Sequence, residues 1–170
     1  VEPDPLVCAY AEGLEMGYRG FDASGVAPLF PFGHGLTYST FTQSSPSVAT
    51  VTNAATRTTT YNVKVTVKNT GSRTTSEVVQ VYVALPASAS DASVGAKQPP
   101  KRLVGFQKVE LAAGASKDVT ISINPSASNH PLSVWHEAYK MWITPTGTYT
   151  VLVGNSSSPK DLVQAGTFNR

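Results

Sequence analysis

Residues 61–68 have the sequence YNVKVTVK, in which valine stands at every second position and polar residues stand between. Residues 77–85, EVVQVYVAL, repeat this alternation after the polar segment NTGSRTTS (69–76), which contains a Thr-Gly turn signal. Successive side chains of a β-strand point to opposite faces, so each run presents one apolar and one polar face. The two runs therefore predict two half-buried strands joined by a turn.

The same kind of pattern continues to the end of the chain. Further candidate strands lie at residues 102–111, 116–123, 132–136, 139–143 and 148–154, with a weaker one near 162–168. Short strands of alternating polarity, separated by turn residues, predict a mainly β fold of the immunoglobulin or fibronectin type III-like β-sandwich kind. The side chains expected to face its core are those of Val65, Val67, Val79, Val81, Leu103, Phe106, Val119, Ile121, Trp142, Val151 and Val153.

Residues 1–41 have a different character. Residues 5–16 place apolar side chains at helical spacing and predict a short helix, whereas residues 17–35 are rich in glycine and proline and predict an irregular connector. We therefore expect two units, an N-terminal segment at residues 1–41 and a β-sandwich at residues 42–170. The sandwich should carry the stability, with the N-terminal segment draped over it or dependent on a partner.

Composition excludes several classes of protein. The 170 residues include 13 Lys and Arg against 11 Asp and Glu, without a basic run, so no nucleic-acid partner is expected. No apolar run approaches the roughly 20 residues of a membrane span, so no membrane association is expected either. The single cysteine, Cys8, allows neither an internal disulfide nor a zinc cluster built on thiolates. Charged residues are only 14% of the chain, and the abundant Ser and Thr favour a secreted β protein.

The N-terminal residues VEPDP lack the basic and apolar regions of a signal peptide, which indicates either a mature chain or a piece of a longer one. Residues 86–101 are too long and too rich in small residues for a tight turn, and predict an extended surface loop. Lys97, Lys101 and Arg102 form the one local basic cluster and are expected to be solvated side chains at the base of this loop.

Five segments carry a resemblance to a known family. YAEGLEMGYRGFD (10–22) and APLFPFGHGLTYSTF (27–41) resemble the end of the α/β sandwich domain of family 3 glycoside hydrolases. Three later segments resemble the fibronectin type III-like C-terminal domain of the same enzymes: VTVKNTGSRTTSEVVQVYV (65–83), PPKRLVGFQKVELAAGASKDVTISI (99–123) and LSVWHEAYKMWITPTGTYTVLVGNSSSPKDL (132–162). The sequence departs from the family pattern at His136, where an acidic residue is expected, and at Met16, where the family has a smaller aliphatic residue.

This resemblance implies an accessory, structural domain at the C-terminus of a secreted or periplasmic β-glycosidase of the β-glucosidase or β-xylosidase type. Its partners would be the catalytic domains of the same enzyme, and no cofactor is implied. Retaining hydrolysis of a terminal β-linked sugar needs two carboxyl groups about 5–5.5 Å apart. The family's nucleophile lies in a Ser-Asp-Trp context that is absent here, and its acid/base residue lies upstream of the matched segments. The resemblance therefore places no catalytic residue in this chain.

From the residues alone, Glu12 and Asp22 are the one candidate pair of carboxylates. The favoured interpretation makes Glu12 a surface residue or an ion-pair partner near Arg19, and Asp22 part of a turn. His130 and His136 have no partner motif, so no metal site is expected.

The segment PLFPFGHGLTYSTF (28–41) contains the candidate pocket or interface residues Phe32, His34 and Tyr38. The glycines on either side of His34 would let the backbone approach a ligand closely, but a tight turn with local hydrogen bonds is the favoured interpretation. Its dense aromatic side chains favour an interface between domains, with sugar binding at His34 as the alternative.

Two further features are candidates for function. Trp135, Tyr139 and Trp142 would form a platform for stacking sugars, although core placement is favoured for Trp142. Asn155-Ser156-Ser157 is a candidate N-glycosylation sequon, and Ser156 has no His-Asp arrangement that would make it a nucleophile. The alternatives to an accessory domain are a free-standing module that binds polysaccharide, lignin or protein, and one chain of a nicked or two-chain enzyme.

Overall fold

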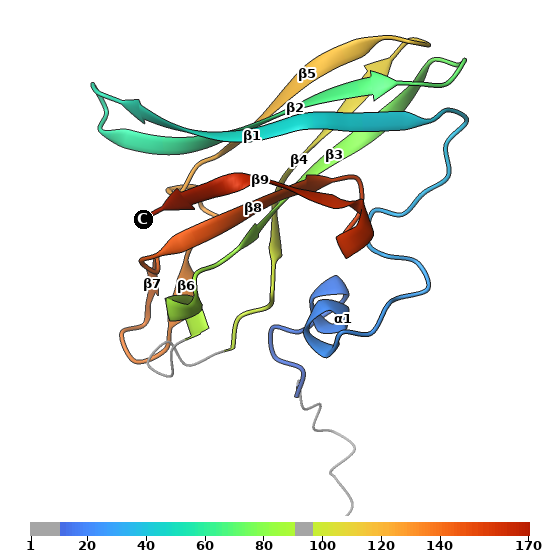
Figure 1. The fold of residues 1–170 in the computed structure, drawn as a ribbon. Coiled ribbons are helices and arrows are strands. Elements are labelled where there is room, and N and C mark those ends of the chain that lie inside the picture. The colour runs from blue at the N-terminus through green and yellow to red at the C-terminus, as the bar shows by residue number, and fades with distance from the viewer. Residues whose placement is uncertain (1–10, 91–96) are drawn as a thin grey trace, which may run out of the picture.

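The computed structural model describes residues 11–90 and 97–170. These residues form two antiparallel sheets that stack face to face, so the predicted β-sandwich is confirmed (Figure 1). The smaller sheet has the strand order β1 (Phe41–Asn53), β2 (Thr58–Asn69), β5 (Ser116–Ile123). The larger sheet has the order β4 (Arg102–Leu111), β3 (Thr75–Ala84), β8 (Thr148–Gly154), β9 (Leu162–Asn169).

Five short elements of the described residues lie outside the two large sheets. A separate hairpin pairs two strands of three residues, and one helix lies beside the larger sheet (Figure 1). These elements are α1 (Tyr18–Ser24), the 3-10 helices η1 (Ala87–Ser90) and η3 (Pro159–Asp161), and the hairpin strands β6 (Val134–His136) and β7 (Met141–Ile143). Within the described ranges, no helix is long and apolar enough to cross a membrane.

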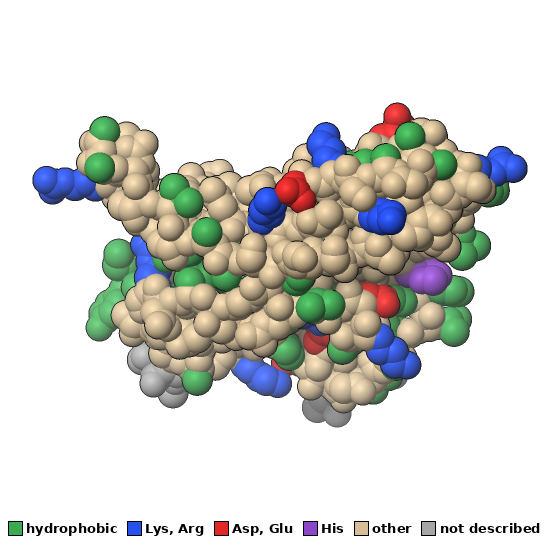
Figure 2. All heavy atoms as spheres, turned by 45° about the horizontal axis from the view of Figure 1, so that its top comes forward, with side chains coloured by type: hydrophobic (Ala, Val, Ile, Leu, Met, Phe, Trp, Pro, Cys, Tyr) green, Lys and Arg blue, Asp and Glu red, His purple; other side chains and the backbone are tan. Residues whose placement is uncertain are grey.

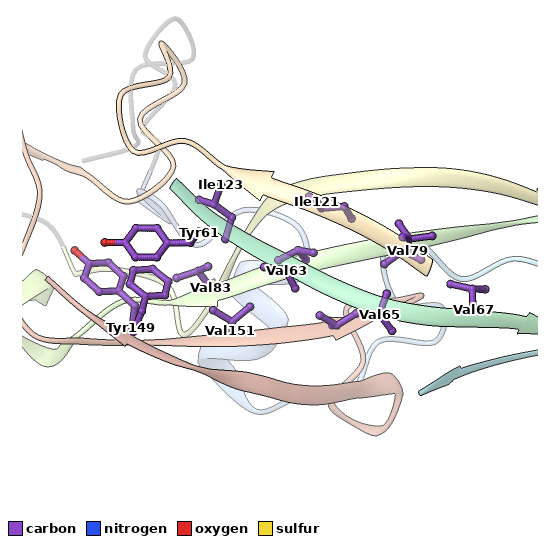
Figure 3. Close-up of a cluster of buried hydrophobic side chains, with 14 of the residues drawn as sticks. Tyr61, Val63, Val65, Val67, Val79, Val83, Ile121, Ile123, Tyr149 and Val151 are labelled. Atoms are coloured by element: carbon purple, nitrogen blue, oxygen red, sulfur yellow. The ribbon is translucent and has the colours of Figure 1, made fainter. Parts of the chain in front are cut away.

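The core lies between the two sheets, where the alternating valines of β2 face those of β3 and β8 (Figure 3). Three aromatic rings close one end of it, because Phe168 stacks on Tyr61 at 3.6 Å and on Tyr149 at 5.0 Å between ring centroids. The prediction of buried side chains is confirmed for Val65, Val67, Val79, Val81, Val119, Ile121, Val151 and Val153.

The prediction of an inward-facing side chain was wrong for three residues of the expected core. Phe106 lies directly opposite Gln80 on the outer face of the sheet and is 69% exposed. An irregularity in register between Val81 and Tyr82 places Leu103 opposite Tyr82, on the same outer face. Trp142 belongs to the β6–β7 hairpin and not to either large sheet. A bulge moves side chains to the other face of a strand, which the period of the sequence does not reveal.

Strand β1 was not predicted, because its sequence FTQSSPSVATVTN has no sustained apolar alternation. It is an edge strand without a fully buried side chain, held by its pairing with β2. The register shifts between Ser44 and Ser47, around Pro46, and edge strands tolerate a proline because one row of their backbone groups needs no partner.

The predicted short helix exists but at a different place. Residues 5–10 of the helix predicted at 5–16 lie outside the described residues, and residues 11–14 form a turn. Helix α1 instead occupies Tyr18–Ser24, within the stretch expected to be irregular, and ends at Gly25 in a left-handed conformation with φ of 69°. Seven residues are too few for a helix to be stable alone, so contacts with the sandwich must hold α1 in place.

Candidate functional site

The N-terminal segment covers the part of the outer face of the larger sheet around Tyr82. Tyr82 points outward from β3, yet its side chain is fully buried. The ring of Tyr18 in α1 packs edge-on against it at 5.6 Å, and the Tyr18 hydroxyl accepts a hydrogen bond from the Leu103 amide at 2.8 Å. Burial raises the pKa of Tyr82, and its hydroxyl donates to Gln80 Oε1 at 2.5 Å. The segment is thus fixed against the sheet.

An ion pair fastens α1 to the start of β4. Lys101 Nζ lies 2.5 Å from Asp22 Oδ2, and the two side chains are 7% and 11% exposed. The expectation that Lys101 is a solvated side chain was therefore wrong, and Asp22 lies in a helix and not in a turn. Arg102 is half-buried and donates to the Ser133 carbonyl at 2.8 Å, whereas Lys97 is exposed and pairs with Glu15. The carboxylate of Asp22 is therefore held in an ion pair, whereas Glu12 is exposed.

After α1 the chain presents an apolar segment, defined here as residues 26–38. Its large apolar side chains lie between 53% and 98% exposed, which is unusual for one contiguous stretch of a stable domain. They are Val26, Leu29, Phe30, Phe32, Leu36 and Tyr38. Figure 2 shows hydrophobic side chains gathered around a histidine at one edge of the molecule.

The backbone of the apolar segment is anchored although its side chains are not covered. The Ser157 amide donates to the Phe32 carbonyl at 2.8 Å. Gly33 has φ of 89° and packs against Gln80 so closely that a Cβ would lie 2.1 Å from the amide nitrogen Nε2. That nitrogen donates to the Asn155 carbonyl at 2.9 Å. The apolar side chains are therefore displayed by a fixed backbone.

His34 lies within the apolar segment. Its ring packs against Phe30 at 5.2 Å, and its amide donates to the Pro31 carbonyl at 2.9 Å, as a local turn requires. It lines a groove of about 360 Å³ together with the half-buried Glu77, with Asp161 and with Asn155. Desolvation raises the pKa of Glu77, although a hydrogen bond from the Val78 amide opposes this effect.

Asn155 of the candidate sequon is exposed and lines the same groove as His34. The two serines that follow are buried, and Ser156 donates to Asp161 Oδ2 at 2.6 Å. A glycan on Asn155 would occupy the groove beside the apolar segment, so glycosylation there and docking of a partner there compete. Glycosylation of Asn155 stays a prediction.

The predicted aromatic platform is only partly assembled. Trp135 and Trp142 lie opposite each other in the β6–β7 hairpin, with ring centroids 5.6 Å apart, and are 40% and 46% exposed. The imidazole of His130 stacks on Trp142 at 4.5 Å. Tyr139 does not join the pair, since it stacks on the buried His136 at 4.1 Å. The tryptophans line a cleft of about 470 Å³ between the hairpin and the N-terminal segment.

The described residues contain no group of three or more His, Cys, Asp or Glu side chains placed to hold a metal ion. The buried contacts of Tyr18, Asp22 and Lys101 were not predicted. One signal was available, because Gln80 and Tyr82 are large side chains on the outer face of a strand that is otherwise valine-rich. A bulky outward tyrosine in a central strand indicates that another segment covers that face.

Comparison with known proteins agrees with this architecture. Residues 77–157 match the family model described as a fibronectin type III-like domain. The chain is 40% identical over 159 residues to a probable beta-glucosidase H from Aspergillus clavatus, which covers 94% of this chain and 18% of that protein. It is 38% identical to thermostable beta-glucosidase B from Acetivibrio thermocellus, with coverage of 91% and 18%.

Solved structures give the same result. A beta-glucosidase from Streptomyces venezuelae, in complex with D-glucose, is 42% identical with a TM-score of 0.77, covering 94% of this chain and 18% of that one. A beta-D-glucoside glucohydrolase from Trichoderma reesei is 30% identical with a TM-score of 0.76, covering 95% and 23%.

The chain therefore contains a fibronectin type III-like β-sandwich domain. Over about 94% of its length the chain matches part of β-glucosidases, which include a GH3 enzyme, and the resemblance seen in its motifs is confirmed. The chain spans about a fifth of the length of these relatives.

Proposed function

We propose that this chain is an accessory, structural domain of a secreted or periplasmic β-glycosidase that removes terminal β-linked sugars such as β-glucosides. The support comes from the relatives, which are named as β-glucosidases, and from the contact of Asp22, whose carboxylate is held in an ion pair with Lys101. The catalytic carboxylates would lie in other domains of the same enzyme. We further propose that residues 1–41 and 42–170 are two units, since β1 begins at Phe41.

The apolar segment would be the surface that docks against the catalytic domains. The observation that carries this proposal is the display of exposed apolar side chains on an anchored backbone. Burying one such side chain contributes about 1.5–3 kcal/mol, so a partner that covers several of them gains enough to form a stable interface. Because the backbone is already fixed, docking costs little further conformational entropy.

This interface explains the segment better than a sugar site at His34 does. His34 shares its groove with Glu77, Asn155 and Asp161, but none of the exposed aromatic rings of the apolar segment lines that groove. A sugar site would pair its aromatic rings with a set of converging polar groups. The free-standing binding module remains the second candidate function, and the tryptophan cleft is the observation that favours it.

The test is reconstitution from two polypeptides. The 170-residue chain would be mixed with the catalytic domains of the enzyme to which it belongs, and association and β-glucoside hydrolysis would be measured. We expect no hydrolysis from the chain alone, and a complex that a Phe30→Ser, Leu36→Ser double variant fails to form. A Val51→Ser variant is the matched control, because Val51 is an exposed apolar residue of β1 and does not belong to the apolar segment.

Two outcomes would contradict the proposal. One is hydrolysis by the purified chain alone, which would require a carboxylate pair in these residues. The other is a complex that forms equally well with the double variant and with the control, which would place the interface elsewhere. A glycan found on Asn155 of the active, assembled enzyme would also exclude the groove beside His34 from the interface.

A further inference from the structure

The cleft beside the β6–β7 hairpin has the features of a binding site that the docking role does not use. Both of the chain's tryptophans line it, and its volume of about 470 Å³ falls in the usual range of roughly 300–1,000 Å³ for small-molecule sites. One wall is the hairpin and the opposite wall includes Leu14 and Arg19 of the N-terminal segment. The cleft therefore forms only because that segment is fixed against the sheet.

The aromatic wall is held in place by its neighbours. The register of the hairpin sets Trp135 opposite Trp142, and the Trp135 indole nitrogen donates to Glu137 Oε2 at 2.9 Å. His130 has a φ of 47°, a left-handed conformation that side chains other than glycine seldom adopt, and its ring stacks on Trp142. Two half-exposed indoles with fixed orientation suit the apolar C–H faces of a sugar ring.

The polar wall carries unbalanced positive charge. Arg102 is fixed by hydrogen bonds from its guanidinium to the Ser133 carbonyl and to Gln98 Oε1, each at 2.8 Å. Arg19 lies over the ring of Tyr18 at 5.9 Å, and no carboxylate of residues 11–90 and 97–170 ion-pairs with it. Burial, with the nearby charge of Arg19, lowers the pKa of Arg102. Among the described residues that line the cleft, Glu137 is the one carboxylate against two arginines, and it also pairs with Lys140.

We propose that this cleft binds an acidic β-linked oligosaccharide, with one sugar ring against Trp135 and Trp142 and its carboxylate at Arg19. The choice of a β-linked sugar rests on the proposed function, whereas the stacking and the charge rest on the cleft itself. A neutral sugar would use the tryptophans but leave the guanidinium of Arg19 without a partner. An arginine suits a carboxylate because its planar fork donates two parallel hydrogen bonds.

Tryptophan fluorescence reports directly on occupancy, because the chain has no tryptophan outside the cleft. The 170-residue chain would be titrated with cellobiose and with cellobiouronic acid, the same β-linked disaccharide with a carboxylate in place of one hydroxymethyl group. We expect a saturable change in emission with both sugars, and binding of the acid about tenfold tighter at low salt, as one added charged hydrogen bond predicts. The preference should shrink as salt is added.

Variants separate the two walls. Arg19→Gln should remove the tenfold preference and leave cellobiose binding unchanged, whereas Arg19→Lys should keep part of the preference. Trp142→Ala should abolish binding of both sugars, with Trp135 still present as the reporter. Tyr38→Ser is the control, since Tyr38 belongs to the apolar segment and does not line the cleft.

Three results would overturn the inference. The first is no response to either sugar, and the second is equal affinity for the two. The third is a change in emission that follows the concentration of the chain itself, which would assign the cleft to contact between copies. A chain that docks to the catalytic domains but gives no sugar response would overturn this inference and leave the proposed function standing.

Discussion

Lys101 and Asp22 form a buried ion pair that joins the N-terminal segment to the β-sandwich, with 2.5 Å between Nζ and Oδ2. The ammonium group also lies 5.8 Å from the centre of the Tyr82 ring, which Tyr18 covers from another side. These contacts attach the N-terminal segment to the β-sandwich, although the residues involved are far apart in the sequence. The display of the apolar segment and the shape of the tryptophan cleft both depend on this attachment.

Removal of one partner of the pair should destabilise the protein. Asp22→Asn leaves the Lys101 charge buried without a counter-charge, which costs about 3 kcal/mol, at the lower end for broken buried pairs. An Asp22→Leu, Lys101→Met double variant should recover most of the loss, because no buried charge remains. Denaturant unfolding of the three proteins measures this. Asp118→Asn is the control, since its pair with Lys64 is exposed. Equal effects of the Asp22 and Asp118 variants would contradict the assignment.

Glu77 should make the stability depend on pH in a defined direction. Desolvation raises its pKa above the ordinary value of 4.5 in the folded state, so the folded protein holds this proton more tightly than the unfolded chain does. Its contribution to stability is therefore present below pH 4.5 and is lost as the pH rises through the folded pKa.

Glu77→Gln removes this titration while keeping an oxygen that accepts from the Val78 amide. The variant should have a higher melting temperature than the wild type at pH 7, and the difference should vanish near pH 4. Thermal unfolding at a series of pH values tests this. A Glu110→Gln variant in β4 makes the same substitution at an exposed position and is the matched control. A wild type more stable than the Glu77 variant at pH 7 would show that the carboxylate is stabilising.

Trp142 should contribute little to stability. Its ring is 46% exposed and packs against Trp135 and His130 and not in the core, so Trp142→Ala should cost less than about 1 kcal/mol. Phe168→Ala is the comparison, because Phe168 is buried between two tyrosines and its loss should cost about 3–5 kcal/mol. Denaturant unfolding measures both. A similar loss of unfolding free energy in the two variants would indicate that Trp142 packs in the core.

The strands that were predicted correctly share one property. In β2 and β3 the valines recur with period two because both strands have one face in the core. The alternation in the sequence therefore predicts which side chains are buried. The period was misread at Phe106, because alternation with the buried Val109 and Leu111 places Phe106 on the outer face. Strand β1 was not predicted because backbone pairing with β2, and not burial of its side chains, holds it in place. Backbone pairing does not require a particular pattern of apolar residues.

The sequence indicated which residues make up the apolar segment, but it did not indicate which contacts attach the N-terminal segment to the sheet. The density of aromatic residues around Phe32 and Tyr38 indicated an interface, and these side chains are exposed in the structure. The contact of Lys101 with Asp22 joins residues 79 positions apart, and no local pattern reports such a distance. The pairing of Trp135 with Trp142 follows from a two-stranded hairpin, whose register the sequence does not fix by burial on one face.

The last prediction concerns the N-terminal segment as a whole. Deletion of residues 1–38 uncovers Tyr82 and removes Tyr18, but it keeps Ser39, whose hydroxyl donates to the buried Asn69 at 2.6 Å. The sandwich core between the two sheets is untouched, so unfolding should remain a single cooperative transition. Exposure of the Tyr82 ring should lower the free energy of unfolding by about 2 kcal/mol.

The pKa of Tyr82 should also fall toward its ordinary value, because burial is the main cause of its elevation. Denaturant unfolding and a spectroscopic titration of the tyrosines measure the two effects. Tyr18→Ala in the full chain is the matched variant, and it should reproduce part of both changes since Tyr18 covers Tyr82 directly. Loss of cooperative unfolding after the deletion would show that the N-terminal segment belongs to the folding core, and an unchanged Tyr82 titration would show that other residues bury it.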